Sequence, residues 1–137
     1  MRFPTVSRLI AVIPFLWFGY AAAQTPHLTI NGSNTIGAEL GPALVEGMLR
    51  DDGAKNIRVQ LDPSTNEHRI SAVDANGKPV YIHLNAHGSS TGFKALLDGS
   101  GQIAASSRTI RPSEVASLIP QGSMLSKDTE QIIALDA

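Results

Sequence analysis

The chain has 137 residues, of which 42% are hydrophobic and 17% are charged. This composition suits one globular domain and excludes a charge-rich disordered chain or a fibrous repeat. Eleven Lys and Arg residues stand against twelve Asp and Glu residues, so charge gives no reason to expect a nucleic acid as partner. The absence of cysteine excludes disulfides, thiolate metal sites and a lipoprotein anchor.

The first 23 residues have the pattern of a secretory signal peptide. Arg2 and Arg8 precede an apolar stretch at 9–20, and the three alanines at 21–23 form a small-residue cleavage site. The apolar stretch is shorter than the roughly 20 residues that a transmembrane helix needs. We therefore expect residues 1–23 to be removed, which leaves a secreted domain of residues 24–137.

The first predicted unit is a strand, a tight loop and a helix. His27–Asn31 alternates polar and apolar residues, and Gly32-Ser33-Asn34 follows as turn residues. Apolar residues then recur at spacings of three and four, which predicts a helix from Ile36 to about Leu49 with one apolar face. The residues of this face are Ile36, Leu40, Ala43, Leu44, Gly47 and Met48.

A strand and a hairpin are predicted next. Asn56–Leu61 alternates apolar with polar residues, the period of a half-buried strand. Glu67–Asp74 and Pro79–Asn85 flank Asn76-Gly77, which is the strongest short signal for a β-hairpin because both residue types accept positive φ. We expect this hairpin to be inserted before the second strand-loop-helix unit.

The rest of the chain repeats the order of strand, loop and helix. After the loop at 88–92, apolar residues have helical spacing until Asp98-Gly99 ends the helix. Ile103–Ala105 predicts a short strand, Pro112 opens a helix to about Leu118, and Gln131–Leu135 predicts the last strand. This alternation favours an α/β fold.

Polar loops of small residues follow three of the predicted strands, at 32–35, 88–92 and 106–109. The first two begin helices, whose unpaired N–H groups and dipole favour an anion. In an open α/β sheet these loops gather at the carboxyl ends of the strands, where ligands usually bind. The alternative is that their Ser and Thr hydroxyls only cap the helices.

Four blocks of sequence are distinctive in their order and spacing: Leu28–Gly37, Gly88–Gly99, Ile103–Arg108 and Glu130–Asp136. Together they resemble the first half of the phosphate-type periplasmic substrate-binding proteins of ABC transporters. The resemblance implies the first lobe of a type II periplasmic-binding fold, and we expect the chain to be truncated, with the second lobe absent. It also implies a small tetrahedral oxyanion such as phosphate as ligand, and an ABC permease as partner of the full-length protein.

Matched by motif, the resemblance implies contacts to the anion from eight residues. They are Ser33, Thr35, Ile36, Ser89, Ser90, Thr91, Ser107 and Arg108. Family members usually have an aspartate at the position of Ser107, whereas a serine hydroxyl can donate or accept, which leaves the choice of anion open. Arg108 is as suited to a bidentate clamp on the anion as to a salt bridge.

Two motifs point to chemistries other than anion binding. Gly88–Gly92 matches the G-x-S-x-G nucleophile elbow with Ser90 as nucleophile, but α/β-hydrolases place the triad histidine after the serine, and the last histidine here is His87. His83 and His87 lie on a predicted strand and loop, about 13 Å apart and too far for one zinc ion.

We therefore expect a binding protein without enzymatic activity, metal or cofactor. A non-transport module of the cell envelope that uses the same lobe is the alternative, and a serine hydrolase is less favoured. We expect no nucleic acid among its partners.

Overall fold

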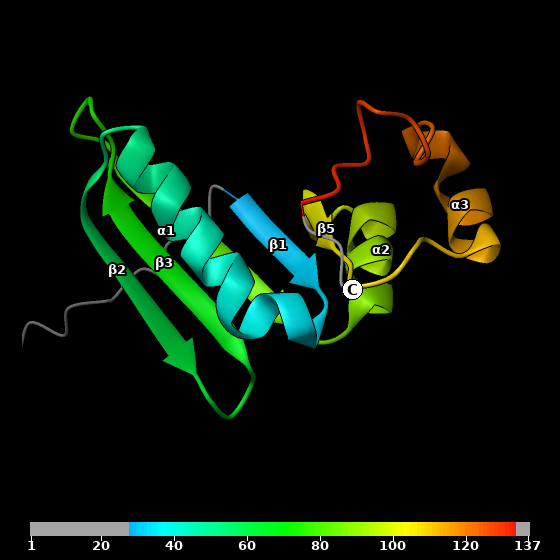
Figure 1. The fold of residues 1–137 in the computed structure, drawn as a ribbon, viewed down its shortest axis with the longest axis horizontal. Helices are drawn as coiled ribbons and strands as arrows, with labels where there is room; N and C mark the ends of the chain where they lie inside the picture. Colours follow the sequence, from blue (N-terminus) through cyan, green and yellow to red (C-terminus); the bar gives the residue numbers. More distant parts are fainter. Residues whose placement is uncertain (1–27, 134–137) are drawn as a thin grey trace, which may run out of the picture.

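The computed structural model describes residues 28–133, so the predicted signal peptide and its cleavage site lie outside the described residues. Within this range the chain forms one five-stranded sheet and three α-helices (Figure 1). The strands are β1 Leu28–Gly32, β2 Lys55–Asp62, β3 Glu67–Val73, β4 Pro79–Ala86 and β5 Ile103–Ala105. The α-helices are α1 Gly41–Asp51, α2 Ser89–Asp98 and α3 Pro112–Leu118. A π-helical turn, η1 Ile36–Leu40, precedes α1, and a 3₁₀ turn, η2 Ile119–Gln121, follows α3. None of these helices is both long enough and apolar enough to cross a bilayer.

The strand order in the sheet is β2-β3-β4-β1-β5, which places the first strand of the fold between β4 and β5. β1 pairs in parallel with both neighbours, with Ile30 opposite Leu84 of β4 and Ile103 of β5. β2, β3 and β4 form an antiparallel meander, in which His68 lies between Leu61 and Leu84. The predicted α/β class is confirmed, and the predicted hairpin is the β3–β4 pair.

The turn of that hairpin differs in detail from the expected Asn-Gly turn. Gly77 has φ +82°, but Asn76 has no positive φ. The carboxylate of Asp74 accepts hydrogen bonds from the backbone N–H groups of Asn76 and Lys78, at 2.9 and 2.8 Å. These bonds hold the pKa of Asp74 below its usual value, and a side-chain acceptor therefore organises the turn together with the glycine.

The two longer helices cover opposite faces of the sheet. Successive residues of a strand point to opposite faces. Ile30 of β1 belongs to the core under α1, whereas the backbone oxygen of Asn31 lies 2.5 Å from the position a Cβ would take at Gly92 of α2. The core between α1 and the sheet consists of Ile30, Val45, Leu49, Ile70, Ala72, Ile82, Leu84 and Ala86.

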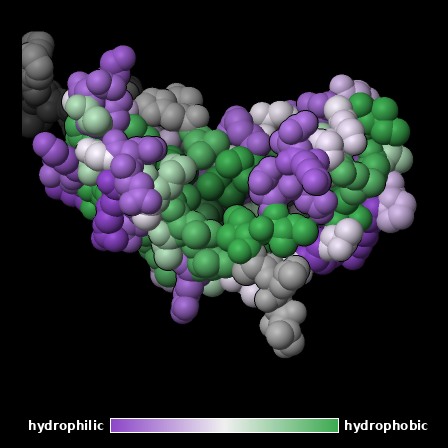
Figure 2. All heavy atoms as spheres, turned by 45° about the horizontal axis from the view of Figure 1, so that its top comes forward, coloured by the Kyte–Doolittle hydropathy of each residue, from purple (hydrophilic) through white to green (hydrophobic). Residues whose placement is uncertain are grey.

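The predicted apolar face of the first helix is not the buried one. The helix buries Gly37, Gly41, Pro42, Val45 and Leu49. Leu40, Leu44 and Met48, which the periodicity placed in the core, are 41–46% exposed. Figure 2 shows apolar side chains gathered on a hollowed surface over the middle of the molecule.

Two glycines explain this rotation of the helix. A Cβ atom at Gly37 would lie 2.4 Å from the Cβ of Ala86, and one at Gly41 would lie 2.7 Å from Cδ1 of Leu84. The backbone of the helix therefore rests directly on β4 along its glycine side. The periodicity rule counts apolar side chains, so it cannot detect a face that is buried because it has none.

The other predicted elements of residues 88–135 are confirmed except for the loop at 88–92 and the last strand. β5 and α3 occur where the sequence predicts them, whereas α2 begins at Ser89, so residues 89–92 form its first turn rather than a loop. The predicted strand Gln131–Leu135 is wrong for residues 131–133, which form no strand, and residues 134 and 135 lie outside the described range. Ile132 and Ile133 are 72% and 69% exposed, and neither pairs with any of the five described strands.

Candidate functional site

Three serines from the three polar loops meet at one edge of the sheet. The Ser33 hydroxyl donates to the Ser107 hydroxyl at 2.9 Å, and the backbone N–H of Ser107 donates to the Ser89 hydroxyl at 3.3 Å. They meet because β1, β4 and β5 are parallel, so the loops that follow them leave the sheet at the same end. We call Ser33, Ser89 and Ser107 the serine cluster.

The members of the serine cluster differ in exposure. Ser33 is only 3% exposed, and its backbone N–H donates to the carbonyl of Ala105 at 2.8 Å. Ser107 is exposed and Ser89 is half-buried. Ser33 therefore lies behind the surface, and Ser107 is the hydroxyl that a ligand reaches from solvent.

The two helices that begin at this edge direct backbone N–H groups toward it. α2 starts after Gly88 without a side-chain cap, and the helical turn that starts at Ile36 also has none from Thr35. Thr35 is exposed, and the N–H of Ile36 lies 3.5 Å from the Ser33 hydroxyl. The N–H groups of Ile36 and Gly37 already donate to Ser33. First-turn N–H groups have no partner within their own helix, so the uncapped start of α2 is the end that can donate to an anion.

Thr91 has a local role in this arrangement. Its hydroxyl donates to the carbonyl of Gly88 at 2.7 Å. Because a hydroxyl has a single proton to donate, Thr91 has none left for an anion at this position.

Arg108 was predicted either to clamp the anion or to form a salt bridge, and in the structure it forms a salt bridge with Glu114. Its NH1 donates to Glu114 and to the carbonyl of Thr109, both at 2.9 Å, and its NH2 donates to Glu114 at 2.7 Å and to Ser90 at 2.9 Å. A guanidinium has five N–H donors, so these four bonds leave only Nε–H. The guanidinium also lies 5.4 Å from the centre of the Phe93 ring, within reach of a cation–π contact.

Glu114 is the functional group that sequence reasoning missed. The hydrogen bond from Arg108 is the main cause that lowers the pKa of Glu114 from 4.5 to about 2, with smaller contributions from the Arg111 N–H and Ser90. Burial opposes this shift. The sequence contained a weak signal, since an acid in the first turn of a predicted helix often accepts backbone N–H bonds, as Glu114 does from Arg111 at 2.9 Å.

Ser90 has no histidine among its hydrogen-bond partners, and the carboxylate beside it, Glu114, is a weak base because its pKa is lowered to about 2. The hydrogen-bond partners of its hydroxyl are Arg108 and Glu114, and a guanidinium cannot accept a proton. His87 instead lies with Nε2 2.8 Å from the carbonyl of Thr65 and 3.5 Å from the carboxylate of Glu67. Among residues 28–133, no three His, Asp or Glu side chains are close enough to share a metal ion.

Comparisons of the chain with protein-family models, with curated proteins and with solved structures found no match. The family resemblance therefore rests on the four blocks of sequence alone.

Proposed function

We propose that this protein is a secreted, periplasmic solute-binding domain that recognises a small tetrahedral oxyanion, such as phosphate, without chemistry on it. The observation that supports this most is the serine cluster, which joins three loops at the carboxyl ends of neighbouring parallel strands. Hydroxyl and backbone N–H donors around one point suit an anion whose oxygens all accept hydrogen bonds. In this proposal the domain is the first lobe of a type II periplasmic-binding fold that serves an ABC permease.

In this proposal, uncharged hydroxyl and N–H donors provide most of the free energy of anion binding. Ser107, Thr35 and the first N–H groups of α2 contact the anion, while Ser33 positions Ser107 from behind. The charge of Arg108 is balanced by Glu114, so Arg108 shapes the site rather than clamping the anion. Because the donors are exposed and compete with water, we expect a millimolar Kd, about −4 kcal/mol.

Calorimetry with phosphate, sulfate and molybdate tests this function. At least one anion is expected to bind, and Ser107→Ala is expected to weaken binding about tenfold because a charge-assisted hydrogen bond is lost. Ser117→Ala, which removes an exposed hydroxyl on α3 that bonds only within its helix, is the matched control and should bind as the wild type does. No heat with any of the three anions would refute the proposed function.

The proposal also predicts that the protein does not hydrolyse esters. Ser90 lacks a proton acceptor other than the ionised Glu114, which Arg108 already holds through both oxygens. With an activated ester as substrate, we expect the wild type and Ser90→Ala to show the same rate as buffer. Turnover by the wild type that Ser90→Ala abolishes would support the hydrolase alternative instead.

A further inference from the structure

β2 forms one edge of the sheet, and no described strand pairs with its outer side. The strand is eight residues long, and its side chains of Val59 and Leu61 are 38% and 52% exposed. The outward N–H and C=O groups of an edge strand are a ready template for another strand. The outer side of β2 can therefore pair with a strand of complementary sequence.

The regular part of β2 is self-complementary. Residues 58–62 read Arg-Val-Gln-Leu-Asp. Two such segments, antiparallel about a two-fold axis at Gln60, place Arg58 opposite the Asp62 of the second copy and Val59 opposite its Leu61. Gln60 then lies opposite Gln60 of the second copy, and the four flanking pairs join opposite charges or two apolar side chains, which are the pairs that stabilise antiparallel strands.

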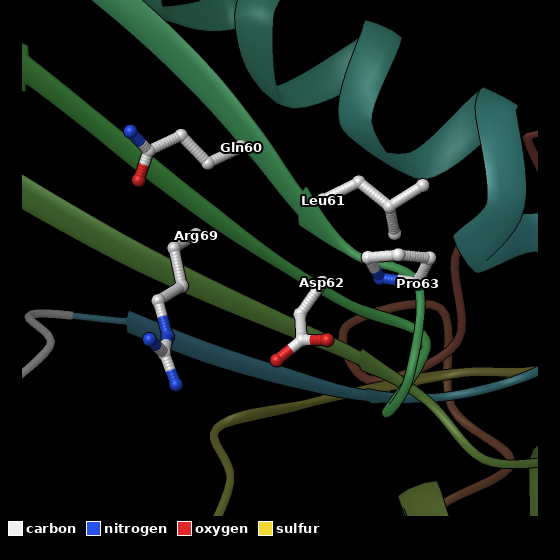
Figure 3. A pocket seen from close by; sticks show the side chains of 5 residues that line it. All are labelled: Gln60, Leu61, Asp62, Pro63 and Arg69. Carbon is white, nitrogen blue, oxygen red and sulfur yellow. The ribbon is translucent and has the colours of Figure 1, made fainter.

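The two faces of β2 agree with this register. Val59 and Leu61 pair with Ile70 and His68 of β3, which are buried on the α1 side of the sheet. Figure 3 shows Leu61 beside the helix, while Asp62 points away from it. Residues directly opposite each other lie on the same face of a sheet. In this pairing the apolar side chains of both copies therefore lie on the α1 side of the sheet, and the polar side chains of both copies lie on the other side. A slip by one residue would mix the two faces.

The groups that the pairing needs are available. Arg58 is exposed, and no described residue forms an ion pair with it. Asp62 Oδ1 accepts two hydrogen bonds from Ser64, and the carboxylate also interacts with the Thr65 N–H and with the charge of Arg69. A carboxylate has about four acceptor positions, so it can still accept from Arg58 of the second copy. A register shift between Lys55 and Arg58, with Asn56 at φ +56°, interrupts the ladder before residue 58. The self-complementary segment is therefore the part of β2 that can pair regularly.

We propose that two copies of this chain associate through β2, with residues 58–62 paired in antiparallel about Gln60. The interface is isologous, so each copy contributes the same surface and the assembly closes as a dimer. β2 is separated from β1 by two strands, so both serine clusters stay open. This inference does not depend on the proposed anion binding.

Charge-swap variants of the full 137-residue chain test the register. Arg58→Asp alone places two aspartates opposite each other at both ends of the interface, and Asp62→Arg alone does the same with arginines. We expect each variant to raise the dimer Kd at least about tenfold in sedimentation equilibrium, since like charges at an interface are costly. An equimolar mixture should dimerise again, within about threefold of the wild type, because both charge pairs are then opposite.

Lys127→Asp provides the matched control, because it makes the same charge change at an exposed residue outside β2. Its dimer Kd should equal that of the wild type. Thermal melts followed by circular dichroism identify any variant that fails to fold. A wild type that stays monomeric to submillimolar concentration would overturn the proposal. Association that the single swaps leave unchanged, or that the mixture does not restore, would also overturn it.

A cysteine placed on the proposed axis gives an independent readout, since the chain contains no native cysteine. Opposite residues of antiparallel strands have Cα atoms about 4.5–5.5 Å apart, a separation that a disulfide spans. Gln60→Cys is therefore expected to form a covalent dimer under mild oxidation, and Ser117→Cys on α3 is not. Equal or weaker cross-linking at residue 60 than at residue 117 would contradict the register.

Discussion

Replacement of Gly32 by alanine is expected to destabilise the protein more than any other single change we consider. A Cβ atom at Gly32 would lie 1.8 Å from the carbonyl oxygen of Ala105, and the residue has φ +151°. The Cβ position is fixed by the backbone of residue 32 and the oxygen belongs to the backbone of residue 105, so the clash is relieved only if β1 separates from β5. Overpacking costs about 1–3 kcal/mol and an unfavourable φ a similar amount, so we expect a loss of about 4 kcal/mol out of the 5–15 typical of a domain.

Urea unfolding followed by circular dichroism measures this loss, and Gly47→Ala is the matched control. A Cβ atom at Gly47 of α1 meets no atom within 4 Å. Alanine there is expected to stabilise the helix by roughly 0.5–1 kcal/mol. A Gly32→Ala protein that unfolds at the wild-type urea concentration would contradict the close approach of β1 and β5.

Replacement of Glu114 by glutamine is expected to have the next largest effect. The amide keeps the volume but removes the charge that Arg108 faces through two hydrogen bonds, at 2.7 and 2.9 Å. The Arg108 side chain is only 27% exposed, so water replaces the lost partner incompletely. We expect a loss of about 2 kcal/mol at neutral pH.

The pH dependence of this difference follows from the pKa of Glu114. The pKa is about 2 in the folded protein against 4.5 as the ordinary value. A lowered pKa means that the ion pair stabilises the fold fully above pH 4.5 and that this stability is lost as the pH falls toward 2. The difference in unfolding free energy between wild type and Glu114→Gln should therefore shrink between these pH values.

Glu130→Gln is the control for this series, because it removes an exposed carboxylate and should leave the unfolding free energy nearly unchanged. A Glu114→Gln protein with wild-type stability at pH 7 would show that the bond to Arg108 contributes little. A difference that grows as the pH falls would contradict the direction of the pKa shift.

The sequence was sufficient for the elements that local signals define. The loops after β1, β4 and β5 were recognisable because each follows an apolar strand, and Gly99 marked the end of α2 with φ +75°. The meeting of Ser33, Ser89 and Ser107 was also predictable, because parallel strands bring the loops that follow them to one edge. Short-range patterns and one topological rule account for this success.

The parts that could not be predicted depend on contacts between distant residues. The rotation of the first helix is set by Ala86 and Leu84, which only the folded sheet brings beneath Gly37 and Gly41. The partner of Arg108 is Glu114, only six residues along the chain, but the sequence pattern did not show that the first turn of α3 would bring this carboxylate to the guanidinium. A motif identifies a candidate donor, but it contains no information about which acceptor the tertiary structure supplies.

The central place of β1 in the sheet constrains the order of assembly. β1 is the first described strand to be synthesised, yet its partners β4 and β5 follow only after the whole meander. β2, β3 and β4 can pair through short connections, and such local contacts form fastest. The sheet therefore cannot close until β5 has been synthesised, and until then Leu28–Gly32 exposes two unpaired edges to chaperones and to aggregation.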